Sequence, residues 1–86
     1  MAKEKRSFVV SILNERETLY YGECSALTVP MKSDTITILP YHTPVIAKLS
    51  KGQVVIRVGR QKSVIAELEG GLLYVGDNEA TVLINL

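Results

Sequence analysis

The chain consists largely of short runs of β-branched and other apolar residues separated by turn-forming residues, and this pattern limits the possible folds more than any other feature. Thr35–Ile38 alternates strictly between threonine and isoleucine, which is the period of a strand with one buried face. No stretch of about 11 residues or more shows a convincing helical stripe. About eight runs follow one another at spacings of roughly 8–12 residues, which predicts an all-β sandwich or barrel. They are Phe8–Leu13, Ser25–Val29, Thr35–Ile38, Val45–Leu49, Gln53–Val58, Ser63–Leu68, Leu72–Val75 and Thr81–Leu86.

Glycine and proline mark where these runs are expected to turn. Gly59–Lys62 and Gly76–Glu79 each lie between two runs, and both predict hairpin loops. Pro30 has no N–H to donate to a ladder, so a central strand is expected to end there. Gly70 and Gly71 are expected to form a tight turn or a bulge, because neither a Lys-Ser/Thr pair nor a helix follows them to make a phosphate-binding loop.

The 86 residues, with a mass of 9.5 kDa, are enough for one domain with a hydrophobic core. Its expected stability is roughly 4–13 kcal/mol, at about 0.05–0.15 kcal/mol per residue. Alternation within the runs indicates which side chains face the space between two sheets. The predicted core residues are Ile36, Ile38, Val54, Ile56, Val64, Leu68, Val82 and Ile84.

Charge and residue chemistry argue against several classes of function. Ten Lys and Arg residues against nine Asp and Glu leave a net charge of +1, which gives no overall attraction to nucleic acid or to an anionic membrane. The chain has no Cys/His cluster with metal-ligand spacing and no Gly-x-Ser-x-Gly motif. Cys24 follows Glu23, whose charge raises the pKa of a neighbouring thiol, so Cys24 is expected to be a buried and unreactive side chain. We therefore expect no catalytic residue, no cofactor and no metal site.

A small β-barrel can also bind single-stranded nucleic acid through aromatic side chains in a positive groove. Here the aromatic residues do not alternate with basic residues along one run; they are Phe8, Tyr20, Tyr21, Tyr41 and Tyr74. For a small β-domain without a catalytic site, two binding functions are then open. Binding of single-stranded nucleic acid is the weaker one, and a stand-alone β-sandwich module that binds another protein is the stronger one.

The most distinctive local feature is the segment from Leu39 to Pro44, which contains two prolines. Pro40 and Pro44 have fixed φ angles and bias the residues before them toward extended geometry, so His42 is held rigidly between them. One interpretation is a histidine that simply stabilises the turn, and local chemistry favours it. The other is a recognition loop.

Two motifs in the chain resemble those of the epsilon subunit of F-type ATP synthases. The first is Ile38–Ile46 followed by Lys51 and Gly52, and the second is Glu69–Val75 followed by Ala80–Ile84. They occur in the family's order, and the spacing between them fits. The opening segments Phe8–Ser11 and Leu19–Gly22 also resemble the family, so the resemblance covers about Ser7 to Leu86.

The resemblance implies a flattened β-sandwich of two sheets with about ten short strands, forming one domain over residues 1–86. The last sandwich strand is expected to end where the sequence ends, at Leu86, so the C-terminal helical hairpin of many family members is not expected here. The chain departs from the family pattern at two places. Tyr41 stands where the family has glycine before its histidine, and Met31–Thr37 lacks the glycines usual in that loop.

The resemblance also implies a function. It is that of a non-catalytic rotor subunit in the central stalk, which joins the gamma subunit to the membrane c-ring and so couples ion-driven rotation to ATP synthesis. Such a subunit lies at the cytoplasmic face of the bacterial inner (plasma) membrane, or at an organelle equivalent, and associates with the membrane only through the complex. No apolar run here approaches the roughly 18–20 residues of a membrane span.

The same resemblance assigns residues to two interfaces. The gamma subunit is expected to contact Ser11, Tyr41, His42 and Ala47. The c-ring is expected to contact Ser33, Asp34 and Thr35. For Ala47 the alternative is a place inside the sandwich, where a larger side chain would overpack the core.

Overall fold

The computed structural model describes residues 6–32 and 34–85, and in this part of the chain all regular structure is β-strand. The strands are β1 (Phe8–Leu13), β2 (Thr18–Cys24), β3 (Ala26–Met31), β4 (Asp34–Ile38), β5 (Val45–Leu49), β6 (Gly52–Val58), β7 (Gln61–Leu68), β8 (Gly71–Gly76) and β9 (Glu79–Ile84). The described residues accordingly contain no helix that could cross a membrane.

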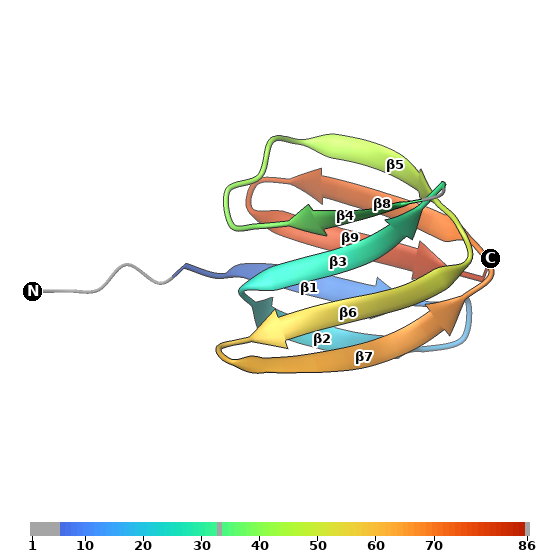
Figure 1. The fold of residues 1–86 in the computed structure, drawn as a ribbon, viewed down its shortest axis with the longest axis horizontal. Coiled ribbons are helices and arrows are strands. Elements are labelled where there is room, and N and C mark those ends of the chain that lie inside the picture. Colours follow the sequence, from blue (N-terminus) through green and yellow to red (C-terminus); the bar gives the residue numbers. More distant parts are fainter. Residues whose placement is uncertain (1–5, 33, 86) are drawn as a thin grey trace, which may run out of the picture.

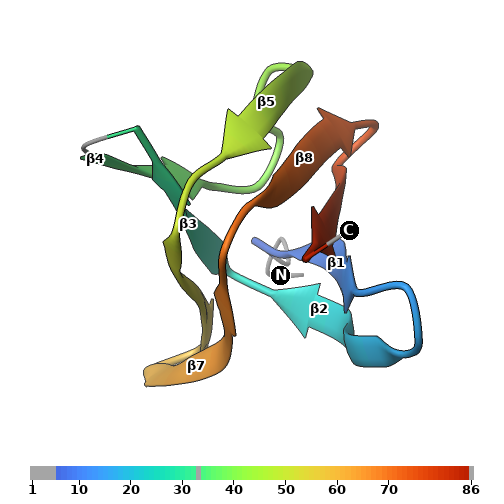
Figure 2. The ribbon, with the colours of Figure 1, turned by 90° about the vertical axis from the view of Figure 1, so that its right-hand side faces the viewer.

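The strands form two sheets that face each other, as the end-on view in Figure 2 shows. One sheet has five strands in the order β2-β1-β9-β8-β5, and the other has four in the order β4-β3-β6-β7. The pairing between β1 and β9 is parallel, and the other neighbouring strands are antiparallel. The predicted two-sheet β-sandwich is therefore confirmed, with nine described strands (Figure 1).

The space between the sheets is filled by apolar side chains. The buried hydrophobic residues are Phe8, Val10, Ile12, Cys24, Leu27, Val29, Ile38, Leu49, Val54, Ile56, Leu68, Leu73, Val75, Ala80, Val82 and Ile84. Six of the eight predicted core residues are among them, and Ile36 is partly buried and packs against this cluster.

The prediction that Val64 belongs to the core is wrong, because its side chain is 55% exposed. In the ladder between β6 and β7, Val54 pairs with Ala66 but Val55 pairs with Val64, so Ile65 is an extra residue on β7. A bulge of this kind reverses the alternation of faces along the strand. Leu68 therefore faces inward as predicted, whereas Val64, on the other side of the bulge, faces outward.

The strand β2 was not among the predicted runs. Only its last residue, Cys24, is fully buried, and its other side chains are exposed or partly buried, so it lacks a strong apolar signal. Its position is fixed by the turn that joins it to β1. The Asn14 side-chain oxygen accepts hydrogen bonds from the backbone N–H groups of Arg16 (2.8 Å) and Glu17 (2.9 Å), which reverses the chain.

The expectation that Pro30 ends a central strand is wrong. β3 continues through Pro30 to Met31, and β4 pairs with it along this stretch. The ladder with β6 covers only Ala26 to Thr28. Pro30 lies beyond it, so its missing N–H costs no hydrogen bond to β6. The Pro30 carbonyl instead accepts a hydrogen bond from the Ser50 N–H (3.0 Å).

Both predicted hairpins are confirmed, each with a two-residue loop. Gly59 has φ 63° in the loop between β6 and β7, and Asp77 and Asn78 have φ 51° and 57° in the loop between β8 and β9. Two successive positive φ values match the right-handed twist of the flanking strands. Residues 69 and 70 form the short connection to β8, which begins at Gly71.

Candidate functional site

The outward face of the five-stranded sheet carries a row of side chains that crosses all five strands in register, with large aromatic and aliphatic residues toward both edges and small ones between them. The pairing places Tyr21 of β2, Ser11 of β1, Thr81 of β9, Tyr74 of β8 and Ile46 of β5 side by side. Their neighbours along the strands point into the core because successive side chains alternate between the two faces. We call this row, together with Leu72 of β8, the five-strand face.

The five-strand face leaves large side chains open to solvent. Tyr21 and Ile46 are each 73% exposed, Tyr74 is 55% exposed and Leu72 is 44% exposed. Tyrosine combines an apolar ring with a polar tip and is enriched at protein interfaces. Exposed apolar side chains gathered on one face of a sheet indicate a protein-binding surface rather than a small-molecule site.

The loop between β4 and β5 lies beside this sheet, at the end of the sandwich that holds the β8–β9 turn (Figure 1). Tyr41 is 75% exposed and has a φ of 63°. Its backbone N–H donates to the Asn78 side-chain oxygen at 2.6 Å. The His42 N–H donates to the Leu39 carbonyl (3.2 Å), and the His42 ring donates through Nδ1 to the Thr43 carbonyl (2.6 Å). The loop is thus held in one shape before any partner binds.

Asn78 connects three parts of the chain at this end of the sandwich. Its side-chain oxygen accepts from the Tyr41 N–H, and its side-chain nitrogen donates to the Ser7 carbonyl (3.0 Å). Its backbone carbonyl accepts from the Val9 N–H (3.4 Å). The sequence identified Asn78 only as part of a hairpin turn. Its role in positioning the Tyr41 loop was missed, because a bond across 37 residues leaves no local signal.

The structure places three of the four residues assigned to the gamma interface on the five-stranded sheet or next to it. Ser11 lies on the five-strand face between Tyr21 and Thr81, and Tyr41 and His42 lie in the loop at the end of the sandwich that holds the β8–β9 turn. Ala47 does not join them. It is partly buried and packs against the core, whereas the residue before it, Ile46, faces outward. Ala47 therefore does not lie on the five-strand face, and its burial agrees with the alternative placement inside the sandwich.

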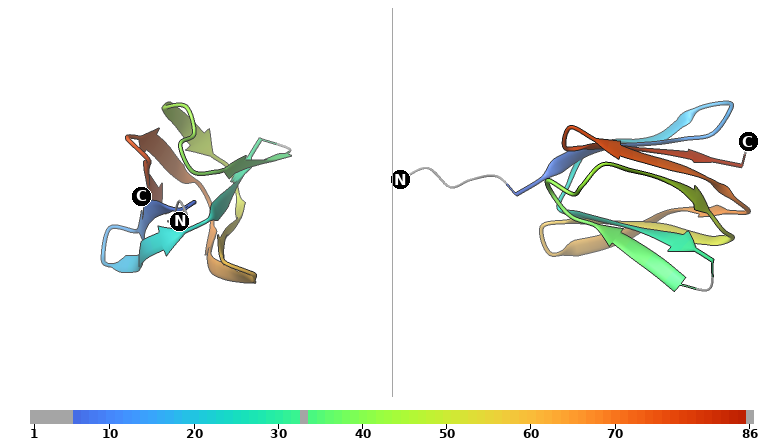
Figure 3. Two further views of the ribbon diagram at one scale, coloured as in Figure 1. Left: turned by 90° about the vertical axis from the view of Figure 1, so that its left-hand side faces the viewer. Right: turned by 90° about the horizontal axis from the view of Figure 1, so that it is seen from above.

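Of the residues assigned to the c-ring, Asp34 and Thr35 lie at the opposite end of the sandwich from the Tyr41 loop (Figure 3, right). Asp34 and Thr35 are exposed at the start of β4, and an Asp34 carboxylate oxygen accepts from the Thr35 N–H at 2.7 Å. A shallow hollow of about 490 Å³ adjoins them, lined in part by Lys51 and Gln53. Ser33 lies outside the described residues.

Cys24 is the one cysteine of the chain, and its side chain is almost completely buried. Burial raises the pKa of its thiol to about 11, although a backbone hydrogen bond with Ala26 acts in the opposite direction. The thiol is therefore protonated near neutral pH and is a poor nucleophile or metal ligand. Within residues 6–32 and 34–85, no three His, Cys, Asp or Glu side chains are grouped so that they could hold a metal ion.

The inward position of Ala47 gives a direct prediction. Ala47→Trp is expected to overpack the sandwich and to lower the free energy of unfolding by about 1–3 kcal/mol. The reference variant is Lys48→Trp, which changes the next residue of the same strand on its exposed side. Chemical denaturation of the two variants tests the placement. Equal stability would contradict an inward Ala47.

Comparison with known families decides what this sandwich is. Residues 7–85 match the model of the β-sandwich domain of the ATP synthase delta/epsilon chain. The chain belongs to this family. The delta/epsilon chain is a non-catalytic subunit of the ATP synthase complex.

Relatives and solved structures agree with this delta/epsilon family assignment. The chain is 36% identical over 74 residues to an ATP synthase epsilon chain of Leptospira interrogans and 35% identical over 74 residues to that of Micrococcus luteus. Both alignments cover 86% of this chain, and it spans 58% and 80% of the two relatives, respectively.

The fold is also that of chains in two cryo-EM structures. One is the Euglena gracilis mitochondrial ATP synthase (OSCP/F1/c-ring), with a TM-score of 0.84 at 15% identity over 96% of this chain and 53% of the other. The other is the central stalk/c-ring of the Tetrahymena thermophila mitochondrial ATP synthase, with a TM-score of 0.74 at 17% identity over 95% and 66%.

Proposed function

We propose that this chain serves as a rotor subunit in the central stalk of an F-type ATP synthase. In this role it joins the gamma subunit to the c-ring, so that ion-driven rotation of the ring reaches the site of ATP synthesis. The chain itself carries out no chemistry. It associates with the membrane through the complex, on the cytoplasmic side in a bacterium or on the equivalent side in an organelle.

The observation that carries this proposal is the five-strand face. A sheet face that presents Tyr21, Tyr74, Ile46 and Leu72 to solvent is suited to burial under a partner. We assign the gamma subunit to this face. Its central residues Ser11 and Thr81 are small, which lets the partner's backbone approach closely. The Tyr41 loop beside it is already ordered by Asn78, so little conformational entropy remains to be lost on binding.

We assign the c-ring to the end of the sandwich that carries Asp34 and Thr35. Small polar side chains suit a hydrated contact, and Asp34 can meet a basic residue of the ring. An exposed ion pair is worth only about 0–1 kcal/mol and weakens with salt, so this contact guides the ring rather than holding it. A subunit with partners on one face and at one end can transmit torque between them.

The first experiment is co-purification of the tagged chain from detergent-solubilised membranes. Recovery of gamma and c subunits supports the proposal. Recovery of the chain without either subunit would instead support the alternative, a stand-alone module that binds another protein.

A pair of variants locates the gamma contact. Tyr74→Glu places a charge on the five-strand face and is expected to weaken gamma binding by at least about 30-fold, the loss typical of an interface hot spot. Val64→Glu is the matched control, because Val64 is equally exposed, at 55%, but lies on the other sheet. Binding is measured by surface plasmon resonance after both melting temperatures have been checked. If Val64→Glu weakens binding as much as Tyr74→Glu does, the assignment to the five-strand face is incorrect.

A further inference from the structure

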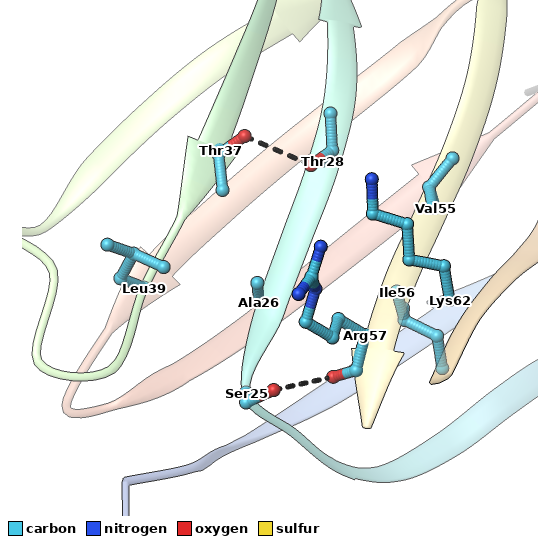
Figure 4. Close-up of a pocket in the computed structure, with 9 residues that line it drawn as sticks. All are labelled: Ser25, Ala26, Thr28, Thr37, Leu39, Val55, Ile56, Arg57 and Lys62. Carbon is cyan, nitrogen blue, oxygen red and sulfur yellow. Dashed lines mark hydrogen bonds between the residues drawn. The ribbon is translucent and has the colours of Figure 1, made fainter. Parts of the chain in front are cut away.

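The outward face of the four-stranded sheet contains a hollow of about 370 Å³ to which the proposed function gives no role. It lies over β3 and between its two neighbours, β4 and β6 (Figure 4). The β3 side chains at its floor, Ala26 and Thr28, are small. Side chains of the neighbouring strands β4 and β6 form its walls. Its volume falls within the range of small-molecule sites, roughly 300–1,000 Å³.

Two cationic side chains line one end of this hollow. Arg57 of β6 and Lys62 of β7 are directly opposite each other in the ladder; Lys62 extends across β6, and Arg57 extends from β6 toward β3 (Figure 4). Like charges directly opposite each other on neighbouring strands destabilise a sheet. Within the described residues, neither side chain has a carboxylate partner.

The rest of the hollow is lined by hydroxyl and apolar groups. The Thr28 and Thr37 hydroxyls are hydrogen-bonded to each other at 3.0 Å on the side of β4. In the ladder between β3 and β6, Ala26 lies opposite Arg57 and Val55 lies opposite Thr28, and both line the hollow. The Ser25 hydroxyl donates to the Arg57 carbonyl at 3.0 Å, which fixes the backbone from which the arginine side chain extends.

From this arrangement we propose that the hollow binds a phosphate-bearing anion, with the phosphate between Arg57 and Lys62. An anion there removes the repulsion between the two cations. The guanidinium can donate two parallel hydrogen bonds to phosphate oxygens, and the lysine supplies a point charge. The phosphate occupies only part of the volume. A phosphate ester would place its organic part over Ala26 and Val55, whereas inorganic phosphate would leave that floor to water.

The test is an NMR titration of the 15N-labelled chain with inorganic phosphate, with ATP and with NaCl at matched ionic strength. Saturable shifts of the Ala26, Thr28, Arg57 and Lys62 amides with phosphate or ATP, and not with NaCl, are expected. Tighter binding of ATP than of phosphate identifies a phosphate ester as the ligand class, and equal affinity identifies free phosphate. Shifts that do not saturate, or that NaCl reproduces, would overturn the proposal.

Three variants make the assignment specific. Arg57→Gln and Lys62→Gln are each expected to weaken phosphate binding at least tenfold. Lys62→Gln is also expected to raise the melting temperature in phosphate-free buffer, because it removes the repulsion, and to abolish any rise caused by phosphate. Lys51→Gln is the control, since it removes a lysine that lines the other hollow of the same sheet. The proposal fails if Lys51→Gln weakens binding as much as the other two, or if Lys62→Gln keeps wild-type affinity.

Discussion

Val82→Asp is expected to destabilise the domain by several kcal/mol. Val82 has no exposed surface, and its strand β9 lies between β1 and β8 in the middle of the five-stranded sheet. The aspartate carboxylate would have no partner there, and an uncompensated buried charge costs about 3–5 kcal/mol. That is most of the lower end of the stability expected for a chain of this length, roughly 4 kcal/mol.

Circular dichroism during thermal unfolding measures this effect, and Thr81→Asp is the matched control. Thr81 precedes Val82 on the same strand but faces outward between Ser11 and Tyr74, where water can solvate a carboxylate. The control should melt close to the wild type. If Val82→Asp also melts close to the wild-type temperature, the Val82 side chain does not face the core.

Gly71→Ala is expected to be the second most damaging change. A methyl group at this position would overlap the backbone of Leu83 on the paired strand β9 and would come within 3.2 Å of the Ile84 Cα. Backbone atoms in a ladder cannot rotate away as a flexible side chain can, so the two strands must separate locally. We expect a loss near the upper end of the range for overpacked sites, about 3 kcal/mol.

The adjacent residue provides the control for this change. At Gly70 an added methyl group would only touch the Leu49 carbonyl at 3.7 Å, an ordinary contact. Gly70→Ala should therefore be nearly neutral in urea denaturation, because it introduces no overlap. If both alanine variants lose the same stability, loss of glycine flexibility in the connection between β7 and β8 is responsible, and the close approach of β8 to β9 is not.

The sequence predicted the strands that have a clear apolar period and missed what depends on the partner strand. Thr35–Ile38 was recognised because its alternation is strict, whereas β2 was missed because only Cys24 at its end is fully buried. Val64 was placed inside because a bulge at Ile65 arises from pairing with β6 and has no signature in the run itself. Pro30 was predicted to end its strand because the length of each ladder cannot be known before the strands are paired.

The candidate site could be predicted less well than the fold. Ser11, Tyr41 and His42 were selected by resemblance, and the structure places Ser11 on the five-strand face and the other two in the loop held by Asn78. The exposed row that includes Tyr21 and Ile46 was not predicted, because it brings together five strands that are far apart in the sequence. Ala47 was assigned to the gamma interface by resemblance, although alternation puts it on the same face of β5 as Val45 and Leu49 and opposite to Lys48.

The parallel pairing of β1 with β9 has a consequence for how the protein is made. These strands are about 70 residues apart, yet β9 separates β1 and β2 from β8 and β5. On the ribosome, β1 and β2 can form a hairpin early, but the five-stranded sheet stays in two pieces until residues 79–84 have emerged. Contacts between distant segments slow folding and expose strand edges meanwhile. The domain should therefore become resistant to protease only after residues 79–84 have left the ribosome.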